Sequence, residues 1–223
     1  MKKKVLLVGA SSEVAKNLFA NYSNDYNFIR LSRQDEESDL TDFDILNPDT
    51  FLKTETNIDG IVYFPGTINL KPFKTLKVND FLDDFNVCVM GLVNILKFYQ
   101  PNFSKNCSLV FISSVASKIG MPFHASVSVS KSALQGLCIS LAAEFSPEVR
   151  VNCISPSLFE SKMSSRFLRN MKAQDRIKEK NPLKLIGKPK DISSIINFLL
   201  SDESRWITGQ NISVDGGMST LKL

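Results

Sequence analysis

The sequence predicts a single α/β domain, built on a doubly wound, mostly parallel sheet with helices on both faces. Three observations support this prediction. Short apolar runs, suited to strands buried on both faces, alternate with segments of helical spacing. The length of 223 residues suits one α/β domain with a sizeable core. No internal repeat, low-complexity segment or linker divides the chain.

The N-terminal part of the chain begins the alternation. The apolar run Val5–Val8 predicts a buried strand, and the helical spacing of Glu13–Tyr22 predicts the helix after it. Phe28–Leu31 predicts a second strand. Asn47-Pro48 predicts the start of a short helix, with asparagine as its cap and proline in its first turn. Ile58–Phe64 predicts the next strand, which a Pro-Gly pair closes.

Two long helices follow, with a strand between them. Val78–Tyr99 and Ser126–Phe145 each predict a long helix, and Ser108–Ile112 predicts the strand that separates them.

The C-terminal part completes the pattern. Val149–Ile154 predicts a strand that ends at a proline. Asp191–Leu200 predicts a helix with aspartate as its cap, and Asn211–Val214 predicts a last strand before a Gly-Gly pair. Right-handed crossovers between such strands give a doubly wound sheet, and ligands then bind at the carboxyl ends of the strands.

Composition and charge exclude several classes of protein. A hydrophobic content of 43% and a charged content of 22% are those of a soluble globular protein. The net charge of +4 is too small to indicate a nucleic-acid partner. Lys2–Lys4 resemble the start of a signal peptide, but the apolar run after them is too short. No stretch approaches the roughly 20 apolar residues of a membrane helix. We therefore expect a cytoplasmic protein without a membrane segment.

The cysteines indicate buried free thiols rather than a metal site. They are widely spaced, form no C-x-x-C pair and share the chain with a single histidine, so no metal site is expected. Each lies in or beside an apolar stretch, which suits a reducing compartment. The four are Cys88, Cys107, Cys138 and Cys153.

The turn after the first predicted strand raises the question of a cofactor. Gly9 allows a tight turn, and the small residues Ser11 and Ser12 leave backbone N–H groups open. Those groups and the dipole of the following helix can face a diphosphate. A single glycine after a strand also fits plain turn chemistry, so the turn alone leaves both interpretations open.

Other segments resemble, in order and with normal spacing, the signature segments of one enzyme family. Residues 9–15 resemble the turn T-G-x-x-x-G-I-G, and residues 59–66 resemble the fourth strand with its N-N-A-G motif. Lys131 corresponds to the lysine of Y-x-x-x-K. The other matching positions are Asn86 and residues 112–114, 150–156 and 207–217. This pattern resembles the short-chain dehydrogenase/reductase family. The resemblance implies a Rossmann-like sheet of seven strands and one dinucleotide-binding domain over 1–223. It also implies a substrate lid at about 157–190.

The resemblance implies a catalytic site that lacks one group. Asn86, Ser114 and Lys131 match the family's active-site asparagine, serine and lysine. Val127 stands four residues before Lys131, where the family has its tyrosine, and the interval from Ser114 is the family's own. That tyrosine gives or takes the substrate proton, and valine can do neither. A positioned acid or base is worth about 10²–10⁴-fold in rate.

Two groups could supply the missing proton. Lys131 could hold a water molecule and pass on its proton. His124 lies three residues before Val127, and imidazole is the usual acid–base group near neutral pH. A surface or helix-capping role for His124 is the alternative. The segment around it resembles a divergent branch of the family that reads H-A-S-[IV] in place of the tyrosine motif.

The phosphate turn departs from the family as well. Glu13 and Ala15 stand where glycines are usual, and the Glu13 carboxylate could compete with a diphosphate at the helix N-terminus. Divergent members with an S-E-I-G turn nevertheless bind dinucleotides. Tyr63 and Phe64 replace the two asparagines of N-N-A-G, while the final glycine is kept as Gly66.

The end of the second strand indicates which dinucleotide binds. Ser32 stands where NAD-preferring members place an acid, and Arg33 follows it, which suits a 2′-phosphate. NADP(H) is therefore favoured and NAD(H) stays possible, while a solvated surface charge is the plain alternative for Arg33. The expected cofactor-binding residues are Gly9, Ser11, Ser12, Val14, Ser32, Arg33, Asp44 at the adenine ring, Gly66, Lys131, and Ser161 at the nicotinamide carboxamide.

The expected lid is strongly basic. It holds ten lysines and arginines against three acids, so the rest of the chain is net negative. Such a lid could attract a small-molecule or carrier-linked anionic substrate, such as an acyl-carrier protein, a coenzyme A ester or a sugar nucleotide. The plain alternative is a solvated helix face, anchored on its other side by Phe167 and Met171.

Two functions remain open at this point. The first is an NADP-dependent oxidoreductase that acts on a carbonyl or hydroxyl group, which Asn86, Ser114 and Lys131 favour. The second is a catalytically silent member that binds a nucleotide or a partner protein, which Val127 and Glu13 favour. In related proteins the two long helices pack against a partner subunit, so a homodimer or homotetramer is expected.

Overall fold

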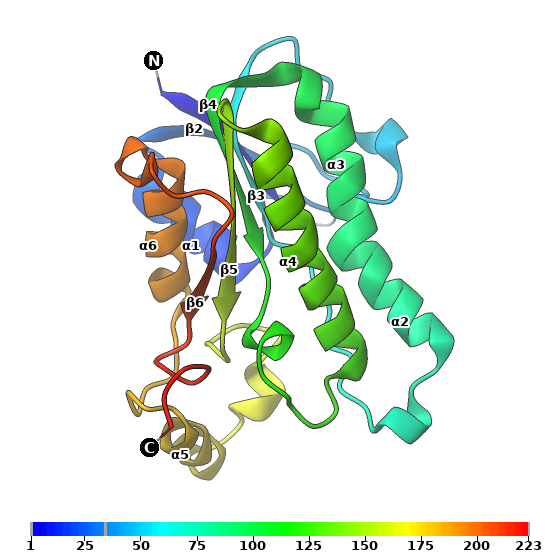
Figure 1. Ribbon diagram of the computed structural model, residues 1–223, viewed down its shortest axis with the longest axis vertical. Coiled ribbons are helices and arrows are strands. Elements are labelled where there is room, and N and C mark those ends of the chain that lie inside the picture. The colour runs from blue at the N-terminus through cyan, green and yellow to red at the C-terminus, as the bar shows by residue number, and fades with distance from the viewer. Residues whose placement is uncertain (1, 34, 223) are drawn as a thin grey trace.

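The computed structural model describes residues 2–33 and 35–222, which form a six-stranded parallel sheet with helices on both faces (Figure 1). The strand order is β2-β1-β3-β4-β5-β6, and every neighbouring pair is parallel. The strands are β1 Lys3–Val8, β2 Tyr26–Leu31, β3 Ile58–Tyr63, β4 Phe103–Ile112, β5 Val149–Pro156 and β6 Asn211–Val214. The α-helices are α1 Glu13–Tyr22, α2 Val78–Phe85, α3 Gly91–Tyr99, α4 Ala125–Phe145, α5 Met171–Lys180 and α6 Pro189–Leu200.

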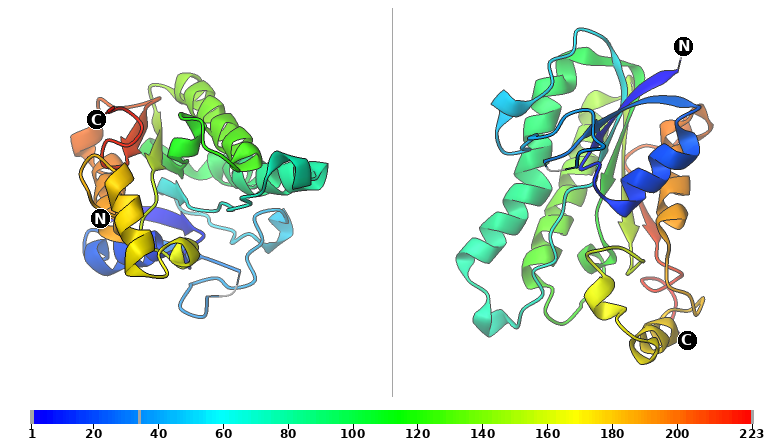
Figure 2. Two further views of the ribbon diagram at one scale, coloured as in Figure 1. Left: turned by 90° about the horizontal axis from the view of Figure 1, so that it is seen from below. Right: turned by 180° about the vertical axis from the view of Figure 1, so that it is seen from behind.

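The sheet separates two apolar layers (Figures 1 and 2). Helices α3 and α4 cover one face, and α1 and α6 cover the other. Successive residues of a strand point to opposite faces, and β1 shows this plainly. Leu6 and Val8 are buried in the layer of α3 and α4, while Val5 and Leu7 are buried in the layer of α1 and α6. The predicted apolar run is therefore buried on both sides.

Among the described residues the sheet has six strands, without the seventh that the resemblance implied. Beyond β2, the polar segment that follows returns for a single parallel bridge between Leu31 and Leu40. Within it the Asp39 carboxylate accepts a hydrogen bond from the Arg30 backbone N–H at 2.8 Å. The Asp39 side chain thus occupies the Arg30 N–H, a backbone donor that a further edge strand would need. The prediction of seven strands was wrong by this one edge strand.

The predicted helix over 78–99 is interrupted. Between α2 and α3, residues Asn86–Met90 form a π-helical segment. The Tyr63 hydroxyl donates to the Val87 carbonyl in this segment at 2.6 Å, and burial raises the pKa of Tyr63 well above its usual value. Gly91 makes room for that hydroxyl, because a Cβ there would lie 2.6 Å from the Tyr63 oxygen. The prediction of one regular helix was wrong at this segment.

Helix α6 begins earlier than predicted. Its cap is Lys188, and its first helical residue is Pro189. Asp191 lies inside the first turn, where its carboxylate accepts a hydrogen bond from the Lys188 backbone N–H at 2.7 Å. Asp191 therefore supports the start of the helix from within it, and its prediction as the cap was wrong.

The remaining composition-based predictions concern thiols and membranes. All four cysteines are buried free thiols, as predicted. Burial raises the pKa of Cys107 to about 12, so this thiol stays protonated at neutral pH. Within the described ranges, no helix is both long and apolar enough to cross a membrane.

Candidate active site

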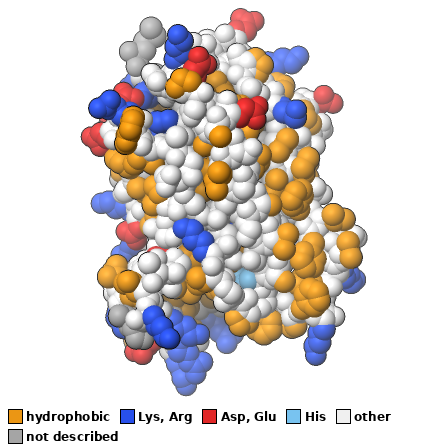
Figure 3. Space-filling model, viewed as in Figure 1, with side chains coloured by type: hydrophobic (Ala, Val, Ile, Leu, Met, Phe, Trp, Pro, Cys, Tyr) orange, Lys and Arg blue, Asp and Glu red, His pale blue; other side chains and the backbone are white. Residues whose placement is uncertain are grey.

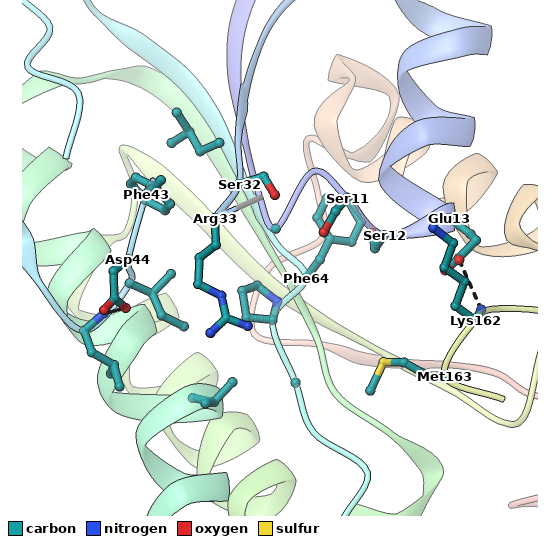
Figure 4. Close-up of a pocket in the computed structure, with 17 residues that line it drawn as sticks. Ser11, Ser12, Glu13, Ser32, Arg33, Phe43, Asp44, Phe64, Lys162 and Met163 are labelled. Carbon is teal, nitrogen blue, oxygen red and sulfur yellow. Dashed lines mark hydrogen bonds between the residues drawn. The ribbon is translucent and has the colours of Figure 1, made fainter. Parts of the chain in front are cut away.

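A cleft of about 500 Å³ opens at the carboxyl ends of β1, β2 and β3 (Figure 4). Parallel α/β sheets bind ligands at this edge, where the turns after neighbouring strands meet. The residues that line it are Gly9, Ser11, Ser12, Glu13, Leu31, Ser32, Arg33, Phe43, Asp44, Ile45, Leu46, Phe64, Pro65, Gly66, Val87, Lys162 and Met163. We call it the nucleotide cleft, because most of the predicted cofactor-binding residues lie in it.

The turn between β1 and α1 forms the floor of the nucleotide cleft. Gly9 has a φ of +84°, which glycine adopts at little cost, and a Cβ there would meet the Pro65 ring at 3.1 Å. The Gly9 N–H donates to the Leu31 carbonyl at 2.9 Å. Ser12 caps α1, since its hydroxyl accepts from the Ala15 N–H at 3.1 Å. The turn is thus held tightly, with the start of α1 facing the cleft.

The end of β2 forms the far wall of the nucleotide cleft. Figure 4 shows Arg33 extending into the cleft between Asp44 and Phe64. Over the described residues, no carboxylate lies within ion-pair distance of Arg33, whereas nearby Lys16 is paired with Asp35. The Asp44 carboxylate accepts from the Leu46 N–H at 2.9 Å. An unpaired guanidinium here can receive a phosphate by charge-assisted hydrogen bonds.

A second cavity of about 240 Å³ adjoins the first at the ends of β4 and β5. Its walls are mostly apolar and come from the loop after β3, the loop after β5 and the start of α4. The residues that line it include Ser12, Glu13, Val14, Phe64, Gly66, Thr67, Ile68, Ser114, His124, Val127, Lys131, Phe159, Ser161, Met163 and Phe167. We call it the apolar pocket; Glu13, Gly66 and Met163 are among the residues that line both cavities.

Lys131 is the buried cation of the apolar pocket. It is 5% exposed, and its Nζ donates to the Ile112 carbonyl at 2.7 Å. A Cβ on Gly66 would lie 3.0 Å from that nitrogen, so the glycine leaves room for the end of the Lys131 side chain. No carboxylate of the described chain lies within ion-pair distance of it. Its charge therefore stays available to a ligand at the junction of the two cavities.

Ser114 lies at the end of β4, beside Lys131 in the lining of the same pocket. Its hydroxyl oxygen accepts a hydrogen bond from the Ala116 N–H at 3.2 Å, which fixes the side chain at the start of a short turn. The hydroxyl hydrogen makes no protein hydrogen bond in the part of the chain that is described. Ser114 can therefore donate to an oxygen atom that enters the pocket.

His124 and Val127 complete this end of the pocket. His124 is the residue before α4, and its Nδ1 lies 2.7 Å from the Pro122 carbonyl. A carbonyl only accepts, so Nδ1 carries the hydrogen and Nε2 is the nitrogen free to exchange a proton. Val127 is 6% exposed and lies in the same lining, one turn before Lys131. His124 and Val127 thus line one pocket, and the resemblance assigns the tyrosine position to Val127.

One predicted residue, Asn86, is absent from the lining of both cavities. Asn86 begins the π-helical segment, is only half-buried and lines neither cavity, although its neighbour Val87 lines the nucleotide cleft. Ser114, Lys131, His124 and Val127 therefore share the lining of one pocket, which does not include Asn86. Phe64 and Phe167 of the pocket wall had been singled out from the sequence, whereas Phe159 and Met163 had not. Their only sequence signal is that they follow strand ends.

Three comparisons with known proteins bear on this site. A protein-family model described as "Enoyl-(Acyl carrier protein) reductase" matches residues 48–219. The chain is 38% identical to mouse (Mus musculus) dehydrogenase/reductase SDR family member 4 over 135 residues, which are 59% of this chain and 48% of that protein. It is 33% identical to the 3-oxoacyl-[acyl-carrier-protein] reductase FabG of Thermotoga maritima, over 72% of this chain and 66% of that protein. The chain spans about half the length of the first curated relatives that it matches.

Solved structures share the whole fold. The ligand-free aldohexose dehydrogenase of Thermoplasma acidophilum superposes with a TM-score of 0.91 at 26% identity, covering 99% of this chain and 96% of that one. Two further structures are a 4-hydroxyisoleucine dehydrogenase with NADH, at 24% identity and a TM-score of 0.86, and ElxO with NADP, at 21% identity and a TM-score of 0.87. Each match covers 99% of this chain and 100% of the other chain. At these identities the likeness is one of fold alone.

Proposed function

Since the chain belongs to the short-chain dehydrogenase/reductase family, we propose that it is an NADP-dependent oxidoreductase whose substrate proton passes through His124 instead of a tyrosine. The observation that carries this proposal is the arrangement of Ser114, Lys131 and His124 around one pocket, with Val127 at the tyrosine position. The tethered Nδ1 of His124 leaves Nε2 as the group that exchanges the proton.

The nucleotide cleft supports a dinucleotide. Gly9 and Gly66 stand where a Cβ would crowd the neighbouring side chains, so the cleft floor stays low enough for close approach. Arg33 favours the 2′-phosphate of NADP over NAD, because it is a cation without a protein partner in the described chain. Ser32 and Asp44 would hold the adenosine half, and Lys131 and Ser161 the nicotinamide half. When bound, NADPH supplies the hydride.

The residues of the apolar pocket would then handle oxygen and proton. Ser114 donates a hydrogen bond to the carbonyl oxygen of the substrate, which draws electron density from the carbon that receives the hydride. His124 in its protonated form gives the proton from Nε2 to that oxygen, and the product is an alcohol. The half-buried position of His124 lets it recover a proton from water. Oxidation of the alcohol runs the same steps in reverse.

The two surfaces of the site favour an apolar carbonyl compound with an anionic handle. The pocket walls are mostly apolar, and its lining includes the polar groups of Ser114 and Lys131. The lid over it carries the ten basic residues counted above, and Figure 3 shows Lys and Arg side chains gathered at that end of the molecule. A carrier-linked substrate fits both properties.

Turnover with NADPH tests this proposal. Wild-type protein should oxidise NADPH in the presence of a long-chain or aromatic ketone, and His124→Ala should lower kcat by about 10²–10⁴-fold. The affinity for NADPH should stay within about threefold, because His124 lines only the apolar pocket. Val127→Tyr on the His124→Ala background should restore turnover. An active His124→Ala variant would contradict the role of the histidine.

A silent site is the second candidate, and Val127 is the observation that favours it. Under that hypothesis the wild-type protein binds NADPH but turns over no carbonyl, and Val127→Tyr alone creates activity. The two candidates therefore differ in one measurement on the wild-type protein.

We also propose self-association through the outer faces of α2 and α4. Exposed apolar side chains gather there, and Figure 3 shows hydrophobic atoms along that side. They include Val78 at 75% exposure, Leu82 at 53%, Val129 at 53% and Ile139 at 59%. A homodimer or homotetramer would bury them, and sedimentation of the full chain measures this directly.

A further inference from the structure

The side chain of Glu13 reaches across the mouth of the site. Glu13 is the first residue of α1, and its Oε1 accepts a hydrogen bond from the backbone N–H of Lys162 at 3.1 Å (Figure 4). The two residues are 149 positions apart in the sequence. Because Glu13 lines both the nucleotide cleft and the apolar pocket, this bond spans the boundary between them.

The partner of Glu13 belongs to a tightly closed turn of the lid. The Ser161 N–H donates to the Ser164 hydroxyl at 2.9 Å, and the Ser164 N–H donates back to the Ser161 hydroxyl at 3.2 Å. The Ser164 hydroxyl also donates to the Phe159 carbonyl at 2.5 Å. These reciprocal hydrogen bonds hold residues 161–164 in one turn, so a displacement of Lys162 also displaces Ser161.

A second contact holds the lid on the other side of the pocket. The Arg166 guanidinium donates from Nη2 to the Ile68 carbonyl at 3.2 Å, in the loop after β3. Like the Glu13 bond it is solvent-exposed, and it is made from outside the 161–164 turn, so it constrains that turn less directly. At its base the lid is fixed by the Glu160 N–H, which donates to the Gly187 carbonyl at 2.9 Å.

We propose that Glu13 is a positioning residue, whose carboxylate seats the lid turn 161–164 against the start of α1 and so holds Ser161 at the junction of the two cavities. This inference rests on the proposed function, because it assigns Ser161 to the nicotinamide end of the cofactor. The proposal also assigns a role to Glu13, which stands in the phosphate turn where the family usually has a glycine. The carboxylate is turned toward the lid amide, and it need not compete with the diphosphate.

The test compares three variants of the full chain by hydrogen–deuterium exchange. Glu13→Ala should speed exchange of the amides in 161–164 by about tenfold, since a bond to a charged acceptor is lost. Glu13→Gln keeps an oxygen acceptor in the same place and should stay within about threefold of wild type. Glu160→Ala is the matched control, because this exposed lid carboxylate makes no hydrogen bond or ion pair within the described residues.

Steady-state kinetics distinguish a positioning role of the Glu13 side chain from a role of its negative charge. If the proposal holds, Glu13→Ala lowers kcat with NADPH about tenfold or more, Glu13→Gln restores most of it, and the Kd of NADPH stays within about threefold. Arg166→Ala should speed lid exchange by a smaller factor than Glu13→Ala, and it serves as the second variant if Glu13→Ala does not fold.

Two results would overturn the proposal. The first is unchanged lid exchange in Glu13→Ala. The second is tighter NADPH binding in both Glu13 variants with the lid unaffected, which would make Glu13 a repulsive charge on the nucleotide. A wild-type protein that binds no NADPH would instead defeat the proposed function, and the exchange comparison would still decide whether Glu13 holds the lid.

Discussion

The two halves of the candidate site are built in different ways. The half at the strand ends is buried and multiply bonded: Lys131 is 5% exposed, and the Ser113 hydroxyl donates to its carbonyl at 3.2 Å. The lid half is open and basic. Helix α5 of the lid has no buried residue. The contacts between the lid and the rest of the site include the single hydrogen bonds made by Lys162 and Arg166.

This difference indicates that the two halves of the candidate site have different roles. Under the proposed function, the groups that meet a hydride and a proton lie on the edge of the sheet, where packing fixes their positions. The groups proposed to admit and select a substrate lie on the more exposed lid. Variants of the proposed catalytic groups at the strand ends should therefore change kcat, whereas variants of the basic lid residues should change substrate affinity and lid dynamics.

Lys131→Met should have the largest effect and most sharply tests this division. It removes a buried donor at the junction of the cavities, and loss of one such positioned donor costs about 10²–10³-fold in kcat. Lys118→Met is the matched control, because Lys118 lines neither cavity and its Nζ instead donates to the Asn211 carbonyl at 2.9 Å. Steady-state kinetics with NADPH measures both. Equal losses in the two variants would break the comparison.

Arg33→Ser should have an intermediate effect, confined to the cofactor. Charge-assisted hydrogen bonds contribute about 1.5–3 kcal/mol, so the Kd of NADPH should rise about 10–100-fold. The Kd of NADH should change by less than about threefold, because NADH has no 2′-phosphate to lose a partner. Calorimetric titration of both nucleotides checks this. A parallel loss for NADH would show that Arg33 is structural.

Asp215→Asn should affect stability but leave the catalytic groups unchanged. Asp215 follows β6, and its backbone carbonyl accepts from Asn181 Nδ2 at 2.9 Å, which anchors the rear of the lid. Burial works to raise the pKa of Asp215, but hydrogen bonds from Ser219 and Gly217 outweigh it and leave the pKa below its usual value. The carboxylate form therefore stabilises the fold at neutral pH, and this contribution is lost as the pH falls through the lowered pKa.

The expected cost of Asp215→Asn is about 1–3 kcal/mol in the free energy of unfolding at neutral pH. Urea unfolding at neutral and acidic pH measures it. The difference between variant and wild type should shrink in acid, where wild-type Asp215 is itself protonated. A difference that grows in acid would contradict the assigned sign.

Most of the fold could be predicted from the sequence, because apolar runs and helical spacing report burial directly. The helix Glu13–Tyr22 and the strand Asn211–Val214 have the predicted bounds. The edge strand after β2 could not be excluded from the sequence, since its absence depends on a side-chain bond from Asp39 to the backbone. The π-helical segment depends on a contact between Tyr63 and Val87 that only the packed structure creates.

The candidate site was predictable where residues follow strand ends. Ser114, Lys131 and Arg33 line the cavities because their positions relative to the strands place them at one edge of the sheet. Asn86 was expected beside them, but it lies in the π-helical segment and lines neither cavity. The bond from Glu13 to the lid joins two distant segments, so no local pattern could have indicated it.

Titration of the wild-type protein with NADPH and NADH, followed by calorimetry, tests the central claim most directly. A dinucleotide-dependent oxidoreductase with an unpaired Arg33 should bind NADPH in the micromolar range and NADH at least about tenfold more weakly. Absence of binding by either nucleotide at millimolar concentration would contradict the oxidoreductase function.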